Sequence, residues 1–249
     1  QPRVNWVVVR VAGQLRSLAR MDIDRIPDSA RRTLTKEGWC AFRAPLLAND
    51  IVLAASQIGT PVCHPGLPMV GVLRPHDRED ARENTTSAIY GRTAFPLHTD
   101  MAHWPLPPRY MVMRASTPVP GFPTILIDSS KIRLDPISRE SCRRASWMVS
   151  GVRKPFLCSM EFDHRGKRGI RWDTCAMSPY GPLARSIQTT ISAALQELLK
   201  DSPIPMDWVS PDEVLIIDNW RMVHMRPHLP ESAMHRTLER VLVKENEVA

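Results

Sequence analysis

The stretch FPLHTDMAHW, from Phe95 to Trp104, places a histidine and an aspartate two positions apart in an otherwise apolar run. Side chains two apart in a β-strand lie on the same face, so we expect His98 and Asp100 to present neighbouring polar groups. A buried carboxylate without a partner is costly. The pair therefore indicates either a buried hydrogen bond between the two side chains or a metal ion.

Length and composition favour one globular domain. The chain has 249 residues, of which 43% are hydrophobic and 24% charged, so it can form one sizeable core. We expect a single domain over residues 1–249, with an α/β portion over about 1–93 and a strand-rich portion over about 94–249. No apolar run is long enough to span a membrane. The five cysteines form no CxxC pair, which is typical of reduced thiols and favours a cytoplasmic location without a membrane contact.

The formal net charge of +7 raises the question of an anionic partner. The basic residues stand singly or in pairs rather than in a long stripe, so the sequence does not favour nucleic acid. It favours an anionic small-molecule substrate instead. The oligomeric state is left open by the sequence.

Apolar periodicity predicts a mainly β fold with flanking helices. Helical spacing covers 29–37, 49–58 and 182–200, whereas the segment from Arg74 to Ser87 is polar and reads as a surface loop. From Ala94 onward, short apolar segments alternate with Pro and Gly, which indicates a sandwich or barrel-like sheet. The helix over 182–200 is expected to cover one outer face of that sheet.

A second informative stretch is VLIIDNWRMVHMRP, from Val214 to Pro227. It predicts an apolar strand, a tight turn at Asp218 and Asn219, and a returning strand that presents His224. Two histidines and one carboxylate are the ligand set that occupies one face of an Fe(II) octahedron and leaves other positions open. Such a site can bind a co-substrate and O₂ on the same metal.

Two arginines follow His224. Arg236 lies twelve residues further on, and Arg240 another four, in HRTLERVLV. A guanidinium is permanently charged and donates a planar fork of hydrogen bonds, so it is suited to hold a carboxylate in a partly dry pocket. One of these arginines is expected to hold an anionic co-substrate.

The motifs HTD, GFPTILID, DNWRMVH and HRTLER, in this order, resemble the Fe(II)/2-oxoglutarate-dependent dioxygenases of the taurine dioxygenase and clavaminate synthase-like group. The resemblance covers about residues 94–243. It implies a double-stranded β-helix, or jelly roll, for the core, with a helical insert. It also implies an oxygenase that uses Fe(II), 2-oxoglutarate and O₂, forms succinate and CO₂, and hydroxylates, desaturates or cyclises a small anionic or amino-acid-like substrate.

The resemblance also implies roles for individual residues. His98, Asp100 and His224 would be the iron ligands, and Arg236 with the hydroxyl of Thr124 would bind 2-oxoglutarate. The family usually has Gly after its second metal histidine, where this chain has Met225, so the place of Arg226 is open. The candidates for substrate contacts are Arg240, Arg171, Asp173, Asn84 and Ser87.

Each assignment has a structural alternative. Arg240 could pair with a nearby acid, and Arg171 with Asp173 could form a plain surface ion pair. For the whole protein, the alternatives are a metal-dependent hydrolase on the same three ligands, which gives Arg236 no role, and a non-catalytic jelly-roll binding protein.

Overall fold

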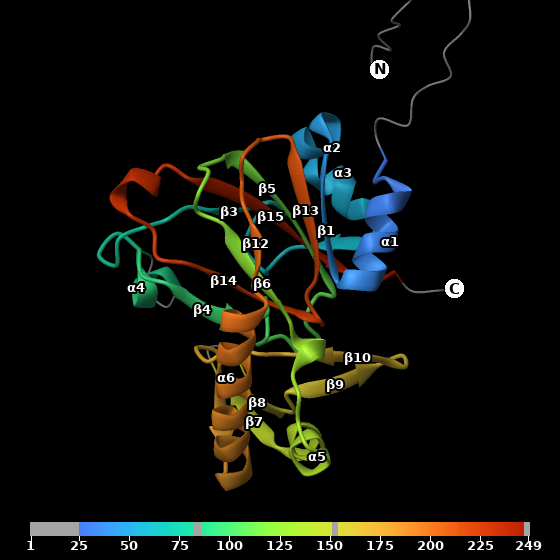
Figure 1. Ribbon diagram of the computed structural model, residues 1–249, viewed down its shortest axis with the longest axis vertical. Coiled ribbons are helices and arrows are strands. Elements are labelled where there is room, and N and C mark those ends of the chain that lie inside the picture. Colours follow the sequence, from blue (N-terminus) through green and yellow to red (C-terminus); the bar gives the residue numbers. More distant parts are fainter. Residues whose placement is uncertain (1–24, 82–85, 151–153, 247–249) are drawn as a thin grey trace, which may run out of the picture.

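Two antiparallel β-sheets form the centre of the structure (Figure 1). The computed structural model describes residues 25–81, 86–150 and 154–246. The larger sheet has six strands, β1 (Trp39–Arg43), β2 (Thr60–Val62), β3 (Gly71–Leu73), β5 (Tyr110–Thr117), β13 (Glu213–Asp218) and β15 (Thr237–Lys244). The smaller has four, β4 (Phe95–His98), β6 (Thr124–Asp128), β12 (Ile204–Met206) and β14 (Met222–Arg226).

The two sheets share one hydrophobic core. Met111 of β5 and Leu215 of β13 pack in the same buried cluster as Leu126 of β6 and Met222 of β14. Alternate residues of the larger sheet face the other way, since Val112 and Val214 belong to a separate cluster. This period of two is what a strand buried on both faces requires. The sheets therefore pack against each other, and their facing sides can enclose a site.

The N-terminal portion covers the outer face of the larger sheet. Helix α1 (Asp28–Glu37) confirms the predicted first helix, and Gly38 ends it in a left-handed conformation with φ of 80°. The predicted second helix over 49–58 is wrong in its bounds, because α2 (Pro45–Asn49) and α3 (Ile51–Ser56) are separate helices. Asp50 breaks the helix at φ −126° and its side chain accepts a hydrogen bond from Leu53 N, which caps α3.

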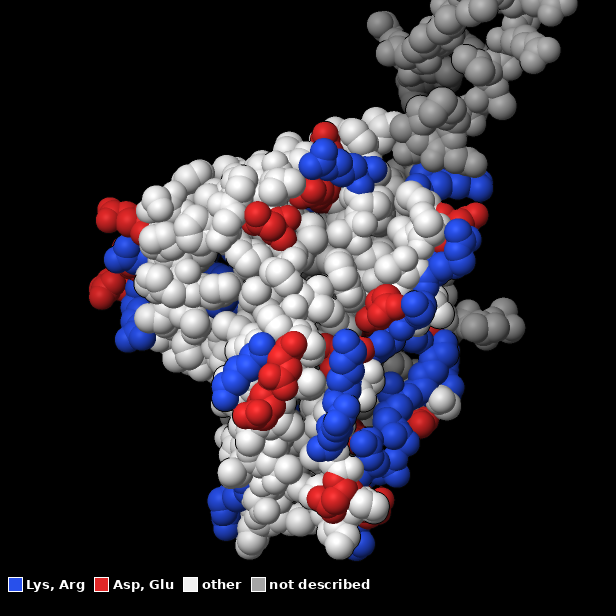
Figure 2. Space-filling model, in the orientation of Figure 1, with Lys and Arg blue, Asp and Glu red and all other residues white. Residues whose placement is uncertain are grey.

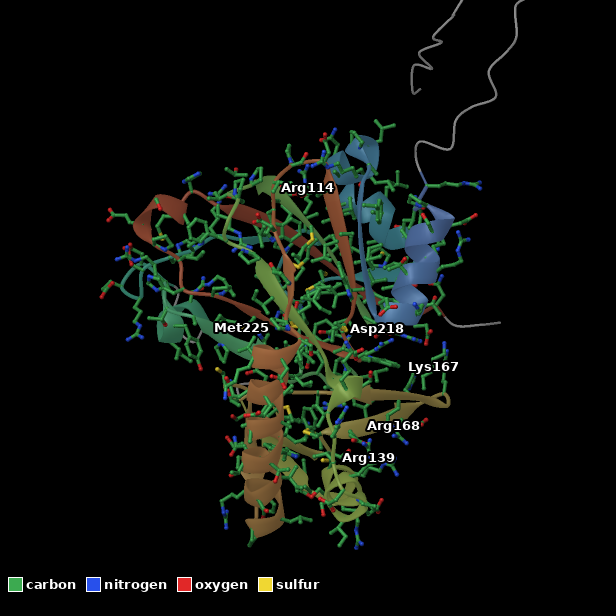
Figure 3. The ribbon with its side chains drawn as sticks, viewed as in Figure 1. Arg114, Arg139, Lys167, Arg168, Asp218 and Met225 are labelled. Atoms are coloured by element: carbon green, nitrogen blue, oxygen red, sulfur yellow. The ribbon has the colours of Figure 1, made fainter. Side chains whose placement is uncertain are left out.

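The segment between β13 and β14 differs from the predicted hairpin. β13 pairs with β1 and β5 in the larger sheet, whereas β14 pairs with β6 and β4 in the smaller one. The turn at Asp218 and Asn219 is present, but the chain uses it to cross from one sheet to the other. Figure 3 shows Asp218 at the end of β13 and Met225 on β14.

An insert between β6 and β12 forms the other end of the molecule (Figure 1). Helix α6 (Pro182–Asp201) confirms the predicted long helix, and it buries Ile187, Ile191 and Leu195 in a core that the insert shares with the smaller sheet. The other elements of the insert are α5 (Pro136–Arg144), β7 (Ser146–Val149), β8 (Phe156–Cys158), β9 (Glu161–His164), β10 (Lys167–Ile170) and β11 (Met177–Tyr180). A short helix α4 (Thr86–Tyr90) precedes β4, and 3₁₀ turns cover Ser129–Lys131 and Glu231–Ala233.

Basic side chains gather on one flank of the insert. Figure 2 shows Lys and Arg along this flank, and Figure 3 places Arg139, Lys167 and Arg168 there. Acidic groups interrupt the flank, since Lys167 pairs with Glu245 and Arg143 lies 3.3 Å from Glu161. The expectation that the chain binds no nucleic acid stays a prediction. Within 25–81, 86–150 and 154–246, no helix has the length and apolar character needed to cross a membrane.

Candidate metal centre and its cavity

A cavity of about 860 Å³ opens between the two sheets. Its wall combines side chains from β3, β4, β5, β14 and β15 with residues of the insert. Apolar side chains such as Met111 and Leu238 form one part of the wall. The polar groups of the wall converge at His98, Asp100 and His224.

Strand pairing brings the two histidines together. His98 is the last residue of β4, and it lies directly opposite His224 of β14 in the antiparallel ladder. Their rings are 4.2 Å apart between centroids. Asp100 follows β4, and its Oδ1 lies 3.6 Å from His98 Nε2 and 3.8 Å from His224 Nε2. Residues 126 positions apart in the chain therefore present three ligand atoms to one point, all within 4.8 Å of one another.

The two imidazoles are held in a state that can bind a metal. His98 Nδ1 lies 2.9 Å from Pro96 O. Because a carbonyl only accepts, Nδ1 carries the proton and Nε2 is left as a free lone pair. Burial, followed by the neighbouring His98, lowers the pKa of His224 to about 3. His224 is therefore neutral at physiological pH, as a metal ligand must be.

Asp100 is a buried carboxylate whose two oxygens face different partners. Burial raises its pKa, but the charge of Arg240 counteracts burial, so that the pKa lies well below its ordinary value. Arg240 Nη1 donates to Asp100 Oδ2 over 2.7 Å. Oδ1, the other oxygen, faces the histidines. Asp100 is therefore ionised, with one oxygen held and the other directed at the centre.

These three residues fit a divalent metal ion. Ligand bonds of about 2.1 Å place two ligand atoms on adjacent positions of an octahedron about 3.0 Å apart. Asp100 Oδ1 lies 3.6 and 3.8 Å from the two histidine nitrogens, and all three ligand atoms lie within 4.8 Å of one another, so small side-chain rotations bring them onto one ion. Two neutral imidazoles and one carboxylate are donors that suit Fe(II), and three ligands leave the remaining positions of an octahedron open.

A second polar group lies deeper in the same cavity. Arg236 is 2% exposed, and its Nη2 donates to Thr124 Oγ1 over 3.2 Å. Trp208 Nε1 donates to the same oxygen over 3.0 Å, so the hydroxyl hydrogen of Thr124 is free to donate to a ligand. Burial lowers the pKa of Arg236 to about 10, and Arg226 contributes in the same direction. Among the residues that the structure describes, none forms an ion pair with Arg236, which leaves a buried cation facing the cavity.

The other predicted site residues divide into two groups. Asp173, Ser87 and Arg240 line the cavity. Arg171 does not line it, because β10 ends at Ile170 and Arg171 is buried, at 3% exposure. Its guanidinium donates to the backbone carbonyls of Ala102, Trp104 and Pro105. Asn84 lies outside the described residues.

Further residues line the cavity beyond the predicted site residues. Arg226 lines the cavity beside Met225, and its Nη2 donates to the carbonyls of Gly91 and Thr93, which ties β14 to the segment before β4. His64 lies 5.9 Å from His103 between ring centroids, and burial followed by the charge of His64 lowers the pKa of His103. The resemblance left the place of Arg226 open, and nothing in the sequence indicates that His64 lies beside His103.

Comparison with known proteins relates this fold to oxygenases. No protein-family model matches the sequence, and no curated protein does. A structure of asparagine oxygenase with Fe(II), hydroxyasparagine and succinate matches 88% of this chain and 80% of its own, with a TM-score of 0.68 and 16% identity. The non-heme iron oxygenase OrfP with Fe and α-ketoglutaric acid matches 89% and 82%, with a TM-score of 0.67 and 17% identity. PvcB from Pseudomonas aeruginosa matches 89% and 81%, with a TM-score of 0.64 and 18% identity. The chain therefore has the fold of the non-heme iron oxygenases.

Proposed function

We propose that this protein is an Fe(II)- and 2-oxoglutarate-dependent dioxygenase. The observation that carries the proposal is the convergence of two donor sets on one cavity. His98, Asp100 and His224 offer three ligand atoms to a metal, and Arg236 with Thr124 offers a buried cation and a hydroxyl to a carboxylate. Asparagine oxygenase and OrfP, which share the fold, carry Fe together with succinate or α-ketoglutaric acid in their structures.

We further infer that the core is a double-stranded β-helix. From β3 to β6, successive strands alternate between the larger and the smaller sheet, and from β12 to β15 they alternate again. Two antiparallel four-strand layers linked in this way are what a jelly roll requires. We also propose that the N-terminal portion and this core are one domain, because α1 and α3 bury Leu34 and Ile51 against β5 and β13.

The protein residues have separable tasks in this function. The three ligands would hold Fe(II) on one face, while Arg236 and the Thr124 hydroxyl would bind the carboxylate of 2-oxoglutarate that lies away from the metal. Together Fe(II), 2-oxoglutarate and O₂ supply the oxidising power to attack an unactivated C–H bond, with succinate and CO₂ as products. The apolar wall at Met111 and Leu238 excludes water from that chemistry.

The substrate class follows from the charged residues of the cavity wall that are not already engaged by other protein groups. Arg240 is engaged by Asp100, and Arg226 by two carbonyls. Asp173 and the exposed Arg74 line the outer part of the cavity with opposite charges. A small anionic or amino-acid-like substrate fits this combination, and the named oxygenases of the same fold hold hydroxyasparagine and hydroxyarginine. Hydroxylation, desaturation and cyclisation are all compatible with this wall.

A hydrolase on the same three ligands is the competing reading. It gives no task to Arg236, a buried guanidinium whose Nε has no hydrogen-bond partner among the described residues. An uncompensated buried cation is costly, so its presence supports a dianionic co-substrate.

The test is the formation of succinate from 2-oxoglutarate in air with Fe(II). We expect the wild-type protein to form succinate and the His98→Ala and Asp100→Ala variants to form none. His228→Ala is the matched control, because His228 is exposed and lies only four residues after His224. Equal succinate formation by all four proteins would overturn the proposal, and hydrolysis without O₂ would favour the competing reading.

A further inference from the structure

Asn219 has a fully buried side chain whose hydrogen-bonding groups are all engaged. Its Oδ1 accepts from Asp100 N over 2.7 Å, and its Nδ2 donates to Asp100 O over 2.9 Å and to Pro108 O over 3.0 Å. The side chain thus clamps the peptide groups on both sides of Asp100. Only an amide supplies an acceptor and two donors in this arrangement.

The clamp joins two parts of the metal centre that the sequence separates. Asn219 lies at the crossover from β13 to β14, five residues before His224. Asp100 lies 119 residues earlier, just beyond the end of β4. The backbone of Asn219 is itself fixed, because its N donates to Arg109 O over 2.7 Å.

Asp100 needs such support because the sheet does not hold it. The ladder pair between His98 and His224 fixes the two histidines, but β4 ends at His98. Met101, directly after Asp100, has a φ of 55°, a left-handed conformation that a residue with a branched or long side chain rarely adopts. The position of the carboxylate relative to His224 therefore depends on contacts outside the ladder.

We propose that Asn219 is a positioning residue that sets the distance between Asp100 and His224 and so determines the affinity of the metal centre. This inference rests on the proposed function, because it takes the three residues to be metal ligands. Partners that orient metal ligands typically affect metal affinity by about 10- to 100-fold when they are removed. We expect a loss of this size when the clamp is removed.

The neighbouring Trp220 offers a matched control. Its Nε1 donates to Pro107 O over 3.0 Å, so it anchors the same crossover to the same loop. It is also buried, at 4% exposure. Trp220 makes no hydrogen bond to Asp100, however. A Trp220 variant therefore destabilises the crossover while the hydrogen bonds from Asn219 to Asp100 stay in place.

The experiment measures Co(II) affinity by titration of the visible absorption spectrum, without 2-oxoglutarate. We expect Asn219→Ala to bind Co(II) about 10- to 100-fold more weakly than wild type and to alter the spectrum. Trp220→Phe should lower the melting temperature but keep the Co(II) affinity within about twofold of wild type, a much smaller change than that expected for Asn219→Ala. Asn219→Ser, which retains a polar group, serves if the alanine variant does not fold, and it should lose affinity as well.

Two results would overturn the inference. One is wild-type Co(II) affinity in a folded Asn219 variant, and the other is an equal loss in Trp220→Phe, which would make the effect one of general stability. Failure of the metal assignment looks different, because the wild-type protein would then show no Co(II) binding that the His98→Ala substitution removes. Failure of the dioxygenase assignment alone would leave Co(II) binding intact and abolish succinate formation.

Discussion

Arg240 Nη1 lies 2.7 Å from Oδ2 of Asp100, and this pair decides which carboxylate oxygen faces the metal centre. The sequence placed Arg240 either in the substrate pocket or in a surface ion pair with a nearby acid. In the structure it lines the cavity, yet its guanidinium is engaged by Asp100. Because Oδ2 is taken, Asp100 offers one oxygen, which leaves more of the metal's coordination sphere for other ligands.

Removal of Arg240 should weaken the metal centre and make it more acid-sensitive. Arg240 lowers the pKa of Asp100, so Arg240→Met should raise that pKa and let protons compete with the metal at higher pH. We expect Co(II) affinity at pH 7 to fall by about 10- to 100-fold. The midpoint pH for metal release should move upward, as a pH titration of Co(II) binding would record.

Arg114→Met is the matched control for that variant. Arg114, which Figure 3 labels on β5, pairs with Glu239 through an Nε to Oε2 distance of 2.8 Å, next to Arg240 on β15. The Arg114→Met variant removes an arginine whose side chain is 17% exposed, against 19% for Arg240, from the strand that pairs with β15, and Arg114 does not line the cavity. A release midpoint that shifts equally in both variants would contradict a specific role for Arg240.

The hydroxyl of Thr124 should matter for 2-oxoglutarate and not for the metal. Thr124→Val keeps the shape of the side chain and removes the free O–H donor beside Arg236. A hydrogen bond to a charged group contributes about 1.5–3 kcal/mol, so we expect KM for 2-oxoglutarate to rise at least about tenfold. Steady-state succinate formation and Co(II) titration check the two halves of this prediction, with Thr189→Val on the exposed side of α6 as control.

The sequence predicts the centre well where the signal is local. The period of two of a strand predicts that His98 and Asp100 lie close together, and they do, although β4 ends at His98 and Asp100 lies in the turn after it. Most of the Pro- and Gly-punctuated apolar segments from Ala94 onward form strands, whereas the strand at Gly169 ends at Ile170. The helix over 182–200 was predicted because five apolar residues recur at helical spacing, and α6 confirms it. Both signals depend on backbone geometry alone.

The errors arise where long-range contacts decide. Nothing near Asp218 reveals that the chain crosses between sheets, because a tight turn serves a hairpin and a crossover equally well. Arg171 was expected near the substrate, yet it holds three carbonyls of the loop after β4. Which carbonyls a side chain meets depends on a fold that brings residues 66 to 69 positions apart together.

The neutral state of His224 should make the metal-free protein acid-sensitive. Its pKa is about 3 in the folded protein against an ordinary 6.5, so below pH 6.5 the unfolded chain takes up a proton that the folded chain does not. The free energy of unfolding should therefore decrease as the pH is lowered, by up to about 1.4 kcal/mol per pH unit. Urea unfolding between about pH 4.5 and 6.5 measures this slope. This pH range is chosen because it lies above the one in which Asp100 titrates.

Two histidine variants separate this effect from the rest of the chain. His224→Gln should show a shallower slope than wild type, because the group that gains the proton is gone. His228→Gln should keep the wild-type slope, since His228 is exposed. Identical slopes in all three proteins would mean that the burial of His224 does not govern the acid sensitivity.

Arg171 should stabilise the fold and leave substrate affinity unchanged. Its guanidinium donates to Ala102, Trp104 and Pro105 and lies 5.0 Å from the ring of Phe162, so Arg171→Met would leave buried carbonyls without donors. We expect a loss of about 3 kcal/mol, which lowers the melting temperature by about 6–12 °C in a protein of this size. Arg168→Met, on the exposed end of β10, should change it little. A raised KM for the organic substrate with an unchanged melting temperature would instead support the substrate contact that the sequence predicts for Arg171.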